Sequence, residues 1–161
     1  MAARMERETP VAEVVEIKSV ADLLGGSRVL RQRLRHPLDV HEALSHGLPA
    51  AALTHLVGNV SLLHDQAFLE SAVGVSLRTL QRFKVAPGKM LSKEQSGRAW
   101  KFADILAKAI EVFGSQEEAE QWLERPAVGL DQRRPIDLLA TPAGVKLLEG
   151  FLGRLKYGVY T

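Results

Sequence analysis

The end of the chain carries a strong helical signal. Thr141 is a good N-cap, because its hydroxyl can accept an unpaired N–H of the first turn, and Pro142 follows at the first helical position, where a missing N–H costs nothing. Apolar residues then recur at helical spacing: Val145, Leu147, Leu148, Phe151, Leu152 and Leu155. Gly158 is placed to end the helix in the left-handed conformation. The pattern predicts an amphipathic helix between Pro142 and Gly158.

The residues around and after this glycine are unusual for a chain end, which is normally polar and frayed. Tyr157, Val159 and Tyr160 stand beside the terminal carboxylate of Thr161. A carboxylate is a strong acceptor for an arginine, and aromatic rings offer rigid contact area. We therefore expect the terminus to act as a ligand for another molecule.

Length and composition exclude several classes of protein. The chain has 161 residues, of which 46% are hydrophobic, so it suits one domain or two small ones with a packed core. It has no cysteine, which excludes disulfides and thiolate catalysis. No apolar run is long enough to span a bilayer, and Met1 to Thr9 lack the apolar core of an export signal. We expect a cytoplasmic protein without a membrane partner.

The fold class follows from the periodicity of the apolar residues. No stretch alternates at period two between turn residues, so the chain is expected to be all-α. Residues 1–20 are charged, lack a clear period and are expected to be mobile. Pro37 ends the next segment, a short helix from Val40 ends at Gly47, and another runs from Pro49 to Gly58.

Four closely spaced arginines, Arg28, Arg31, Arg33 and Arg35, precede this bundle. With a net charge of only +2, the placement of charges decides whether nucleic acid is a partner. One interpretation is a basic arm for phosphates. The other is a solvated helix face with ordinary arginines, which we favour on the sequence alone.

Residues 66–83 are typical of a helix-turn-helix. Gly74 separates two short apolar segments and can make the tight turn, and Ser76 can cap the second helix. Arginine can bind guanine and glutamine can bind adenine, while threonine and lysine suit phosphates or base edges. The predicted DNA-binding residues are Ser76, Arg78, Thr79, Gln81, Arg82 and Lys84. The alternative is two helices of an ordinary bundle.

One residue departs from the helix-turn-helix pattern. Glu70 occupies the position in the first helix that usually holds a small residue at the helix crossing. Either the helices shift to admit its side chain, or the unit is a degenerate copy that binds DNA weakly.

A long helix is predicted from Ser92, which forms a capping box with Gln95, to Gly114. Its buried stripe contains Ala99, Phe102, Ala103, Leu106, Ala109, Ile110 and Phe113. Trp100 and Ile105 lie off this stripe and are expected to face a second helix or a partner. Ser115 and Glu118 repeat the capping box, and the acidic run they open suits a helix N-terminus rather than catalysis.

Catalytic and metal-binding patterns are not found. The five histidines show no metal-ligand spacing, and no nucleophile–base pair or phosphate-binding loop stands out. Gly144, Gly150 and Gly153 mark a close helix approach or a flat contact surface, or they are tolerated substitutions. We expect a binding protein rather than an enzyme, with no catalytic residue, metal or cofactor.

Three groups of residues together resemble the Xre/MbcA/ParS antitoxins: Ser76 to Arg82, Leu91 to Ser96, and Ala109 to Gly114 with Ala119, Trp122 and Leu123. The chain end resembles the toxin-binding domain of that family through Pro135 to Leu139, Thr141 to Gly144, Leu152 to Leu155 and Tyr157 to Thr161. The resemblance covers roughly residues 45–161 and leaves out residues 1–40.

This resemblance implies a function. Such antitoxins of type II toxin–antitoxin systems pair with a RES-domain toxin that degrades NAD⁺, occlude its active site with their C-terminal segment, dimerise, and often repress their own operon by binding operator DNA. Carried over, the toxin-binding residues are Arg154, Tyr157, Gly158, Val159, Tyr160 and Thr161. A homodimer within a hetero-oligomeric toxin–antitoxin complex is implied.

The resemblance also implies the domain organisation. Residues 1–39 form a variable N-terminal arm, residues 40–91 an Xre-like helix-turn-helix domain, and residues 92–161 a small α-helical domain for toxin binding and dimerisation. The alternative function is a stand-alone helix-turn-helix transcription regulator with a C-terminal dimerisation domain.

Overall fold

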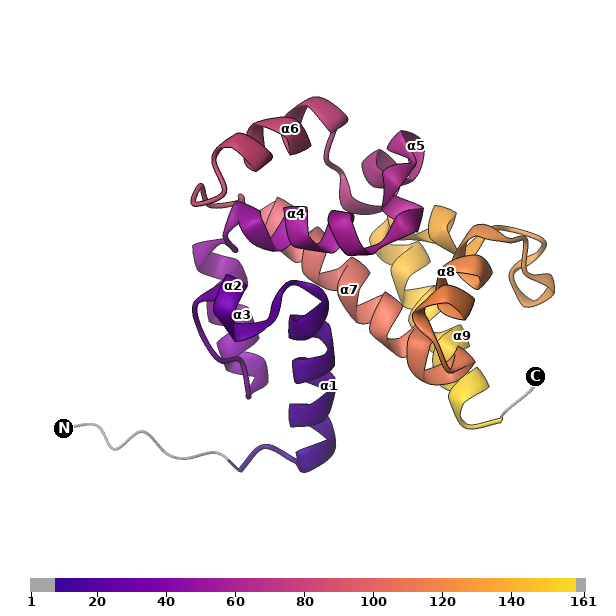
Figure 1. The fold of residues 1–161 in the computed structure, drawn as a ribbon. Helices are drawn as coiled ribbons and strands as arrows, with labels where there is room; N and C mark the ends of the chain where they lie inside the picture. The colour runs from indigo at the N-terminus through magenta and orange to yellow at the C-terminus, as the bar shows by residue number, and fades with distance from the viewer. Residues whose placement is uncertain (1–7, 159–161) are drawn as a thin grey trace.

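The computed structural model describes residues 8–158 and folds them into helices and short helical turns (Figure 1). The first half contains α1 (Val11–Leu23), α2 (Gly26–Leu30), α3 (Pro37–His46), α4 (Ala50–Asn59), η1 (Ser61–His64), α5 (Gln66–Phe68), η2 (Leu69–Val73) and α6 (Leu77–Val85). The second half contains α7 (Lys93–Phe113), α8 (Gln116–Glu124), η3 (Val128–Leu130), η4 (Pro135–Ala140) and α9 (Pro142–Lys156).

The all-α prediction is confirmed, since the described residues form no strand and only two isolated β-bridges. No helix among them is long and apolar enough to cross a membrane.

Helix α7 is the element around which the others pack. It contacts α1, α3 and η2 as well as α8 and α9, and it runs through the middle of the molecule in Figure 1. The predicted stripe is confirmed at its centre, where the most deeply buried side chains are Ala99, Phe102, Ala103, Leu106 and Ala109. Because α7 contacts both the helix-turn-helix side and the C-terminal helices, these two parts of the chain share one core.

The N-terminal region differs from the prediction. Residues 11–20 belong to α1, so the expectation of a mobile segment is wrong there. Ile17, Val20 and Leu24 are buried in the common core, while Val11 and Val15 are exposed on other sides of the helix. These exposed valines blur the helical period, which is why the sequence pattern did not reveal α1.

Trp100 shows where α1 rests. It is 9% exposed and lines a shallow hollow together with Ile17, Val20 and Val40, so it faces neighbouring helices of its own chain. Ile105 is fully buried as well. Of the two partners predicted for these side chains, a second helix of the same chain is the one observed.

Most predicted helix ends are confirmed by their caps. Ser92 and Gln95 form the capping box of α7, and Gly114 ends that helix in the left-handed conformation. Ser115 accepts the N–H of Glu118, so α8 forms this half of its predicted capping box but not the reciprocal bond from the Glu118 side chain. Two bounds are corrected. Helix α3 begins at Pro37, because proline suits the first helical position and the His36 ring accepts the N–H of Leu38 at 3.0 Å. Helix α4 runs through Gly58 to Asn59.

Candidate functional sites

The helix-turn-helix is built around Gly74. This glycine adopts φ +73°, a left-handed conformation that favours glycine, and its N–H reaches the carbonyls of Leu69 and Glu70. Helix α6 then begins at the Ser76 cap, whose hydroxyl accepts the N–H of Thr79 at 3.1 Å. The predicted turn and cap are both confirmed, and they fix the direction in which α6 leaves the turn.

Helix α6 is anchored by one face and presents the other to solvent. Leu80 and Phe83 are buried, while Arg78, Gln81, Arg82 and Lys84 are exposed. Gln81 and Arg82 follow Arg78 by three and four residues, so both lie beside Arg78 on the helix surface. Among the described residues, neither arginine nor Lys84 forms an ion pair within the chain.

Thr79 and Ser76 differ from the other predicted DNA-binding residues. Both are half-buried, and the Ser76 hydroxyl donates to the Thr79 hydroxyl at 3.0 Å. Their hydroxyls therefore stabilise the first turn of α6. The exposed members of the predicted DNA-binding residues are those with long polar side chains.

Glu70 does not lie in the helix crossing. Its side chain is exposed and accepts a hydrogen bond from Gln66 at 3.1 Å, whereas Leu69, Ala72 and Val73 are buried. The reason is the π-helical geometry of η2, whose wider turn changes which positions face the core. Both expectations attached to Glu70 assumed a regular helix, so the residue is no obstacle to a functional helix-turn-helix.

Arg98, on α7, braces the turn, a role that the sequence pattern does not predict. Its guanidinium donates to the carbonyl of Ser71 and occupies the space that a Cβ at Gly74 would need. Arg98 and Ser71 are 27 positions apart in the chain. A local sequence pattern carries no signal over such a separation.

The C-terminal unit begins with a tight corner between η4 and α9. Thr141 caps α9 by accepting the N–H of Gly144 at 3.0 Å, and Pro142 occupies the first turn, as predicted. Gly144 packs directly on the backbone carbonyl of Leu138, so a Cβ there would collide with it. Of the three helical glycines, Gly144 marks a close approach, whereas Gly153 has no neighbour within 4 Å of its ideal Cβ position.

An aromatic stack positions the outer half of α9. Phe113 and Trp122 have ring centroids 4.9 Å apart, and Trp122 stacks on Phe151 at 6.0 Å with an interplanar angle of 4°. The Arg154 guanidinium lies 5.8 Å from the Phe151 ring, within the range of a cation–π contact. No local sequence pattern predicts this stack, because its rings come from three separate helices.

The predicted toxin-binding residues fall partly within the described chain. Arg154, Tyr157 and Gly158 are exposed at the end of α9, and Gly158 adopts the predicted left-handed conformation with φ +66°. Tyr157 is 76% exposed. The contacts predicted for Val159, Tyr160 and Thr161 lie outside the described residues.

The outer face of α9 continues this surface along the helix. Leu147 is 63% exposed, Gly150 is exposed and flat, and Arg154 and Tyr157 follow at helical spacing. We call these four residues the α9 outer face. The Arg154 guanidinium lies 3.6 Å from the ideal Cβ position of Gly150, so the glycine leaves room for the arginine to lie along the helix.

Charged side chains join α9 to α7. Lys101 binds Glu149 at 2.8 Å and Asp104 at 3.5 Å, and Asp104 also binds Lys108 at 3.1 Å. Burial lowers the pKa of Lys101, but the hydrogen bond and charge of Glu149 and the charge of Asp104 outweigh it, so the net pKa lies above its ordinary value. The network holds the inner side of α9 and leaves its outer face free.

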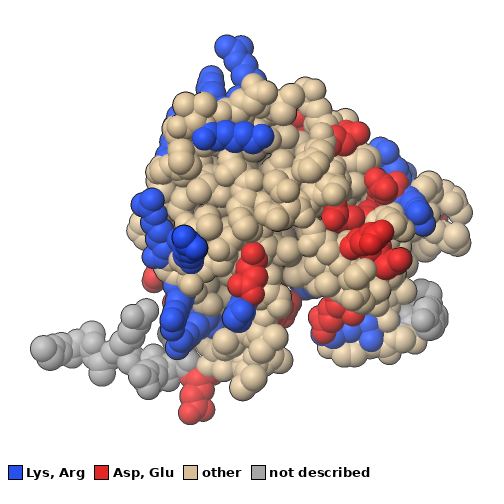
Figure 2. Space-filling model, viewed as in Figure 1, with Lys and Arg blue, Asp and Glu red and all other residues tan. Residues whose placement is uncertain are grey.

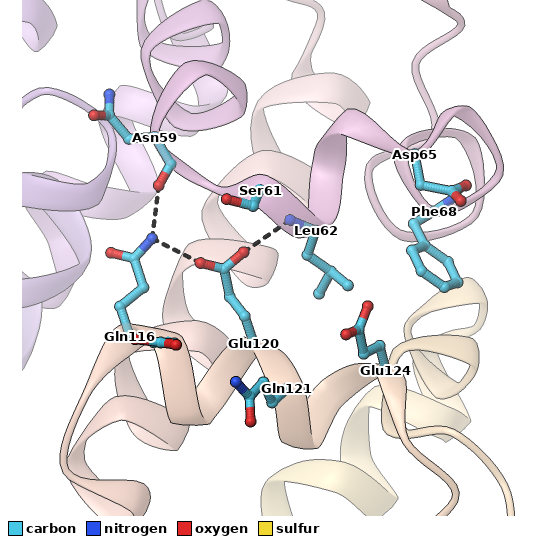
Figure 3. A pocket seen from close by; sticks show the side chains of 10 residues that line it. Asn59, Ser61, Leu62, Asp65, Phe68, Gln116, Glu120, Gln121 and Glu124 are labelled. Atoms are coloured by element: carbon cyan, nitrogen blue, oxygen red, sulfur yellow. Dashed lines mark hydrogen bonds between the residues drawn. The ribbon is translucent and has the colours of Figure 1, made fainter.

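A polar junction joins the helix-turn-helix side to the C-terminal side (Figure 3). The Glu120 carboxylate accepts the N–H of Leu62 at 2.8 Å and a hydrogen bond from Gln116 at 3.1 Å, and Gln116 donates to the carbonyl of Asn59 at 2.6 Å. These bonds border a hollow of about 630 Å³ that is also lined by Asp65, the N-cap of α5, and by other polar side chains of α8. Part of the acidic run therefore has a structural role between the two units.

No cluster of three or more histidine, aspartate or glutamate side chains that could hold a metal ion is present in residues 8–158. The geometry thus offers two kinds of interaction surface: a cationic helix face on α6 and a mixed apolar and cationic face on α9.

Comparison with known proteins defines the class to which these surfaces belong. Residues 39–104 match the antitoxin Xre-like helix-turn-helix domain, and residues 108–158 match the antitoxin Xre/MbcA/ParS C-terminal toxin-binding domain. The two matches leave only three residues between them unassigned. The chain is a helix-turn-helix antitoxin with a C-terminal toxin-binding domain, and it belongs to the Xre antitoxin family.

Individual relatives agree with this assignment. The chain is 28% identical over 130 residues to the antitoxin Xre of Yersinia enterocolitica, with 71% of this chain and 87% of the relative covered. It is 29% identical over 117 residues to the antitoxin Xre of Photorhabdus laumondii, with 72% and 77% covered. A third relative, the antitoxin Xre of Pseudomonas putida, is 26% identical over 125 residues, with 78% and 76% covered.

Proposed function

We propose that this antitoxin neutralises a RES-domain, NAD⁺-degrading toxin by binding it through the α9 outer face and occluding its active site with residues 157–161. The observation that carries the proposal is the exposed end of α9, where Leu147, Arg154 and Tyr157 line one side of a helix whose other side is buried. An exposed apolar and arginine-containing strip of this kind suits a protein interface, in which aromatic residues and arginine are enriched.

The structure supports a preformed docking surface. Three features hold α9 in place without using its outer face: the Thr141 cap, the close packing of Gly144 on η4, and the stack of Trp122 on Phe151. A surface that is already ordered loses less conformational entropy on binding. Arg154 is aligned along the helix by Phe151, and its guanidinium can donate hydrogen bonds to a carboxylate or phosphate of the partner.

Co-purification with the product of the adjacent toxin gene tests this interface. Leu147→Asp places an unpaired charge in the centre of the α9 outer face and is expected to weaken the complex at least about tenfold, because a buried unpaired charge is costly. Lys146→Gln is the matched control, since Lys146 is an exposed neighbour on the same helix. Equal recovery of toxin with Leu147→Asp and with the control would remove α9 from the interface.

We further propose that α6 binds operator DNA and that the antitoxin represses its own operon as a homodimer. Support comes from the exposed cations of α6, which follow a well-formed turn and form no ion pair within residues 8–158. Arg78→Ala should weaken specific binding by about 1–3 kcal/mol if Arg78 binds a base. Unchanged operator affinity for Arg78→Ala and Arg82→Ala combined would reject α6 as the DNA-reading helix.

Both partners, a toxin and operator DNA, imply that the protein acts in the cytoplasm by binding and not as an enzyme. The alternative, a stand-alone transcription regulator, is favoured by the helix-turn-helix alone. It predicts that the purified chain binds DNA but that no toxin gene adjoins its own.

A further inference from the structure

The charges of this chain are segregated although the net charge is only +2. Residues 23–38 contain four arginines and no acidic residue, and residues 71–92 contain two arginines, two lysines and no acidic residue. Residues 109–124 contain five glutamates and no lysine or arginine. In Figure 2 many of the visible Lys and Arg atoms line the side formed by α6, α2 and α3, and much of the visible Asp and Glu gathers on the side of α8, where some Lys and Arg atoms also lie.

The first of these cationic stretches is firmly attached to the core. We call residues 28–35 the arginine segment. Leu30 is 2% exposed and Leu34 is 6% exposed, so both anchor the segment. Arg31 adopts φ +61° and ends α2 in the left-handed conformation. The chain therefore cannot simply extend into solvent, and the arginine side chains project from a fixed backbone.

The arginine side chains of this segment, unlike its backbone, are not used to hold the fold within the described chain. Arg28, Arg31, Arg33 and Arg35 are all exposed, and none of them forms an ion pair with residues 8–158. Four like charges held close together repel one another. This cost is offset when a polyanion binds, because each phosphate that an arginine neutralises releases a condensed counterion.

The arginine segment adjoins the helix-turn-helix. Helix α2 contacts α4, and α4 contacts α6. The loop after α6 also rests on the start of α4, where the N–H of Ala50 donates to the carbonyl of Lys89 at 2.7 Å. Because packed helices lie about 8–10 Å apart and α4 stands between the two, α2 lies within about 16–20 Å of α6. This is less than one turn of B-DNA, about 34 Å, so one duplex can reach both elements.

We propose that the arginine segment is a second DNA-contacting surface, which binds backbone phosphates beside the groove occupied by α6. The proposal rests on the proposed binding of DNA by α6. It assigns different tasks to the two cationic stretches: α6 provides sequence recognition, and the arginine segment adds affinity that does not depend on sequence, because phosphate contacts carry no base information.

The test compares two triple variants of the full-length protein. Arg28→Gln/Arg31→Gln/Arg33→Gln removes three charges from the arginine segment and leaves Arg35, whose N–H is held by the capping carboxylate of Asp39. The control, Arg125→Gln/Arg133→Gln/Lys146→Gln, removes three exposed charges from the C-terminal half. The probes are a duplex of the sequence upstream of the gene and a scrambled duplex of equal length, titrated between 50 and 200 mM salt.

The arginine-segment variant should bind both duplexes at least about tenfold more weakly, and its plot of log affinity against log salt should be less steep by about 2–3, near 0.9 for each lost phosphate contact. The preference for the upstream duplex should not change. The control should match the wild type. Arg28→Lys/Arg31→Lys/Arg33→Lys should restore the salt slope, because phosphate binding here needs only the charge.

A salt slope equal to that of the control would overturn this inference while leaving α6 as the DNA-binding helix. If wild-type protein binds neither duplex, the proposed DNA binding fails and this inference fails with it. Thermal unfolding checks that the variants are folded. Should the triple variant unfold, the single exposed substitution Arg33→Glu provides the same comparison, and an unchanged slope for it would also reject the proposal.

Discussion

The corner between η4 and α9 allows a sharp test with one substitution at two positions of the same helix. Gly144 and Gly153 both lie in α9, and alanine has the higher helix propensity by about 0.5–1 kcal/mol. At Gly153 a Cβ meets no atom within 4 Å, so Gly153→Ala should stabilise the protein by about that amount. At Gly144 the Cβ would collide with the backbone carbonyl of Leu138, which cannot rotate away as a side chain would.

Moving this backbone is expected to cost about 1–3 kcal/mol. The shift would also disturb the cap, in which Gly144 donates to Thr141 at 3.0 Å and which contributes about 1 kcal/mol. After subtraction of the propensity gain, Gly144→Ala should destabilise the protein by about 2 kcal/mol. For a chain of this size this lowers the melting temperature by about 4–8 °C, whereas Gly153→Ala should raise it by about 1–4 °C.

Differential scanning calorimetry of the two variants and the wild type measures the difference. The prediction is a pair of shifts with opposite signs. If Gly144→Ala is as stable as Gly153→Ala, then η4 and α9 are not closely packed, and the account of how α9 is held in place is wrong.

Three further predictions concern other contacts. Trp122→Ala removes the middle ring of the aromatic stack and should destabilise the protein by about 2–3 kcal/mol. This is somewhat below the usual cost for a buried tryptophan, because Trp122 is half-buried. Urea unfolding measures the loss, and Trp122→Phe should recover part of it. Arg98→Ala removes the charged donor to the Ser71 carbonyl and should lower the free energy of unfolding by about 1–2 kcal/mol. It should also weaken DNA binding, because the turn before α6 loses its brace. A normal DNA affinity of this variant would show that Arg98 does not support the DNA-binding unit. Because the pKa of Lys101 is raised in the folded state, its contribution to stability is complete below its ordinary pKa of 10.5 and is lost as pH rises through the higher pKa of the folded state. The difference in unfolding free energy between wild type and Lys101→Met should therefore be constant from pH 7 to 9.5. A difference that disappears by pH 9 would contradict this.

Local signals predicted a large part of this fold. Caps are local, because Ser76, Ser92 and Thr141 each bond the N–H three residues further on, and a short window of sequence contains both partners. The helical periods of α7 and α9 were also visible, since these helices bury one face and expose the other. The turn at Gly74 was also predicted, because a glycine between two short apolar segments is a local signal.

What escaped prediction depends on contacts between distant residues or on irregular geometry. Trp122 stacks on rings from α7 and α9, and Arg98 reaches back to Ser71, neither of which a local pattern encodes. Glu70 was misplaced because a π-helical turn shifts the face that a regular helix would present. Helix α1 was missed because exposed valines surround its buried side.

The central claim is that residues after α9 block the active site of a toxin, and inhibition of the purified toxin measures this directly. NAD⁺ consumption by the product of the adjacent toxin gene is followed while full-length antitoxin, or a variant that ends at Gly158, is titrated in. We predict that the full-length protein stops NAD⁺ consumption at stoichiometric amounts. The shortened variant should still bind through α9 but should leave most of the activity. Full inhibition by the shortened variant would contradict the account.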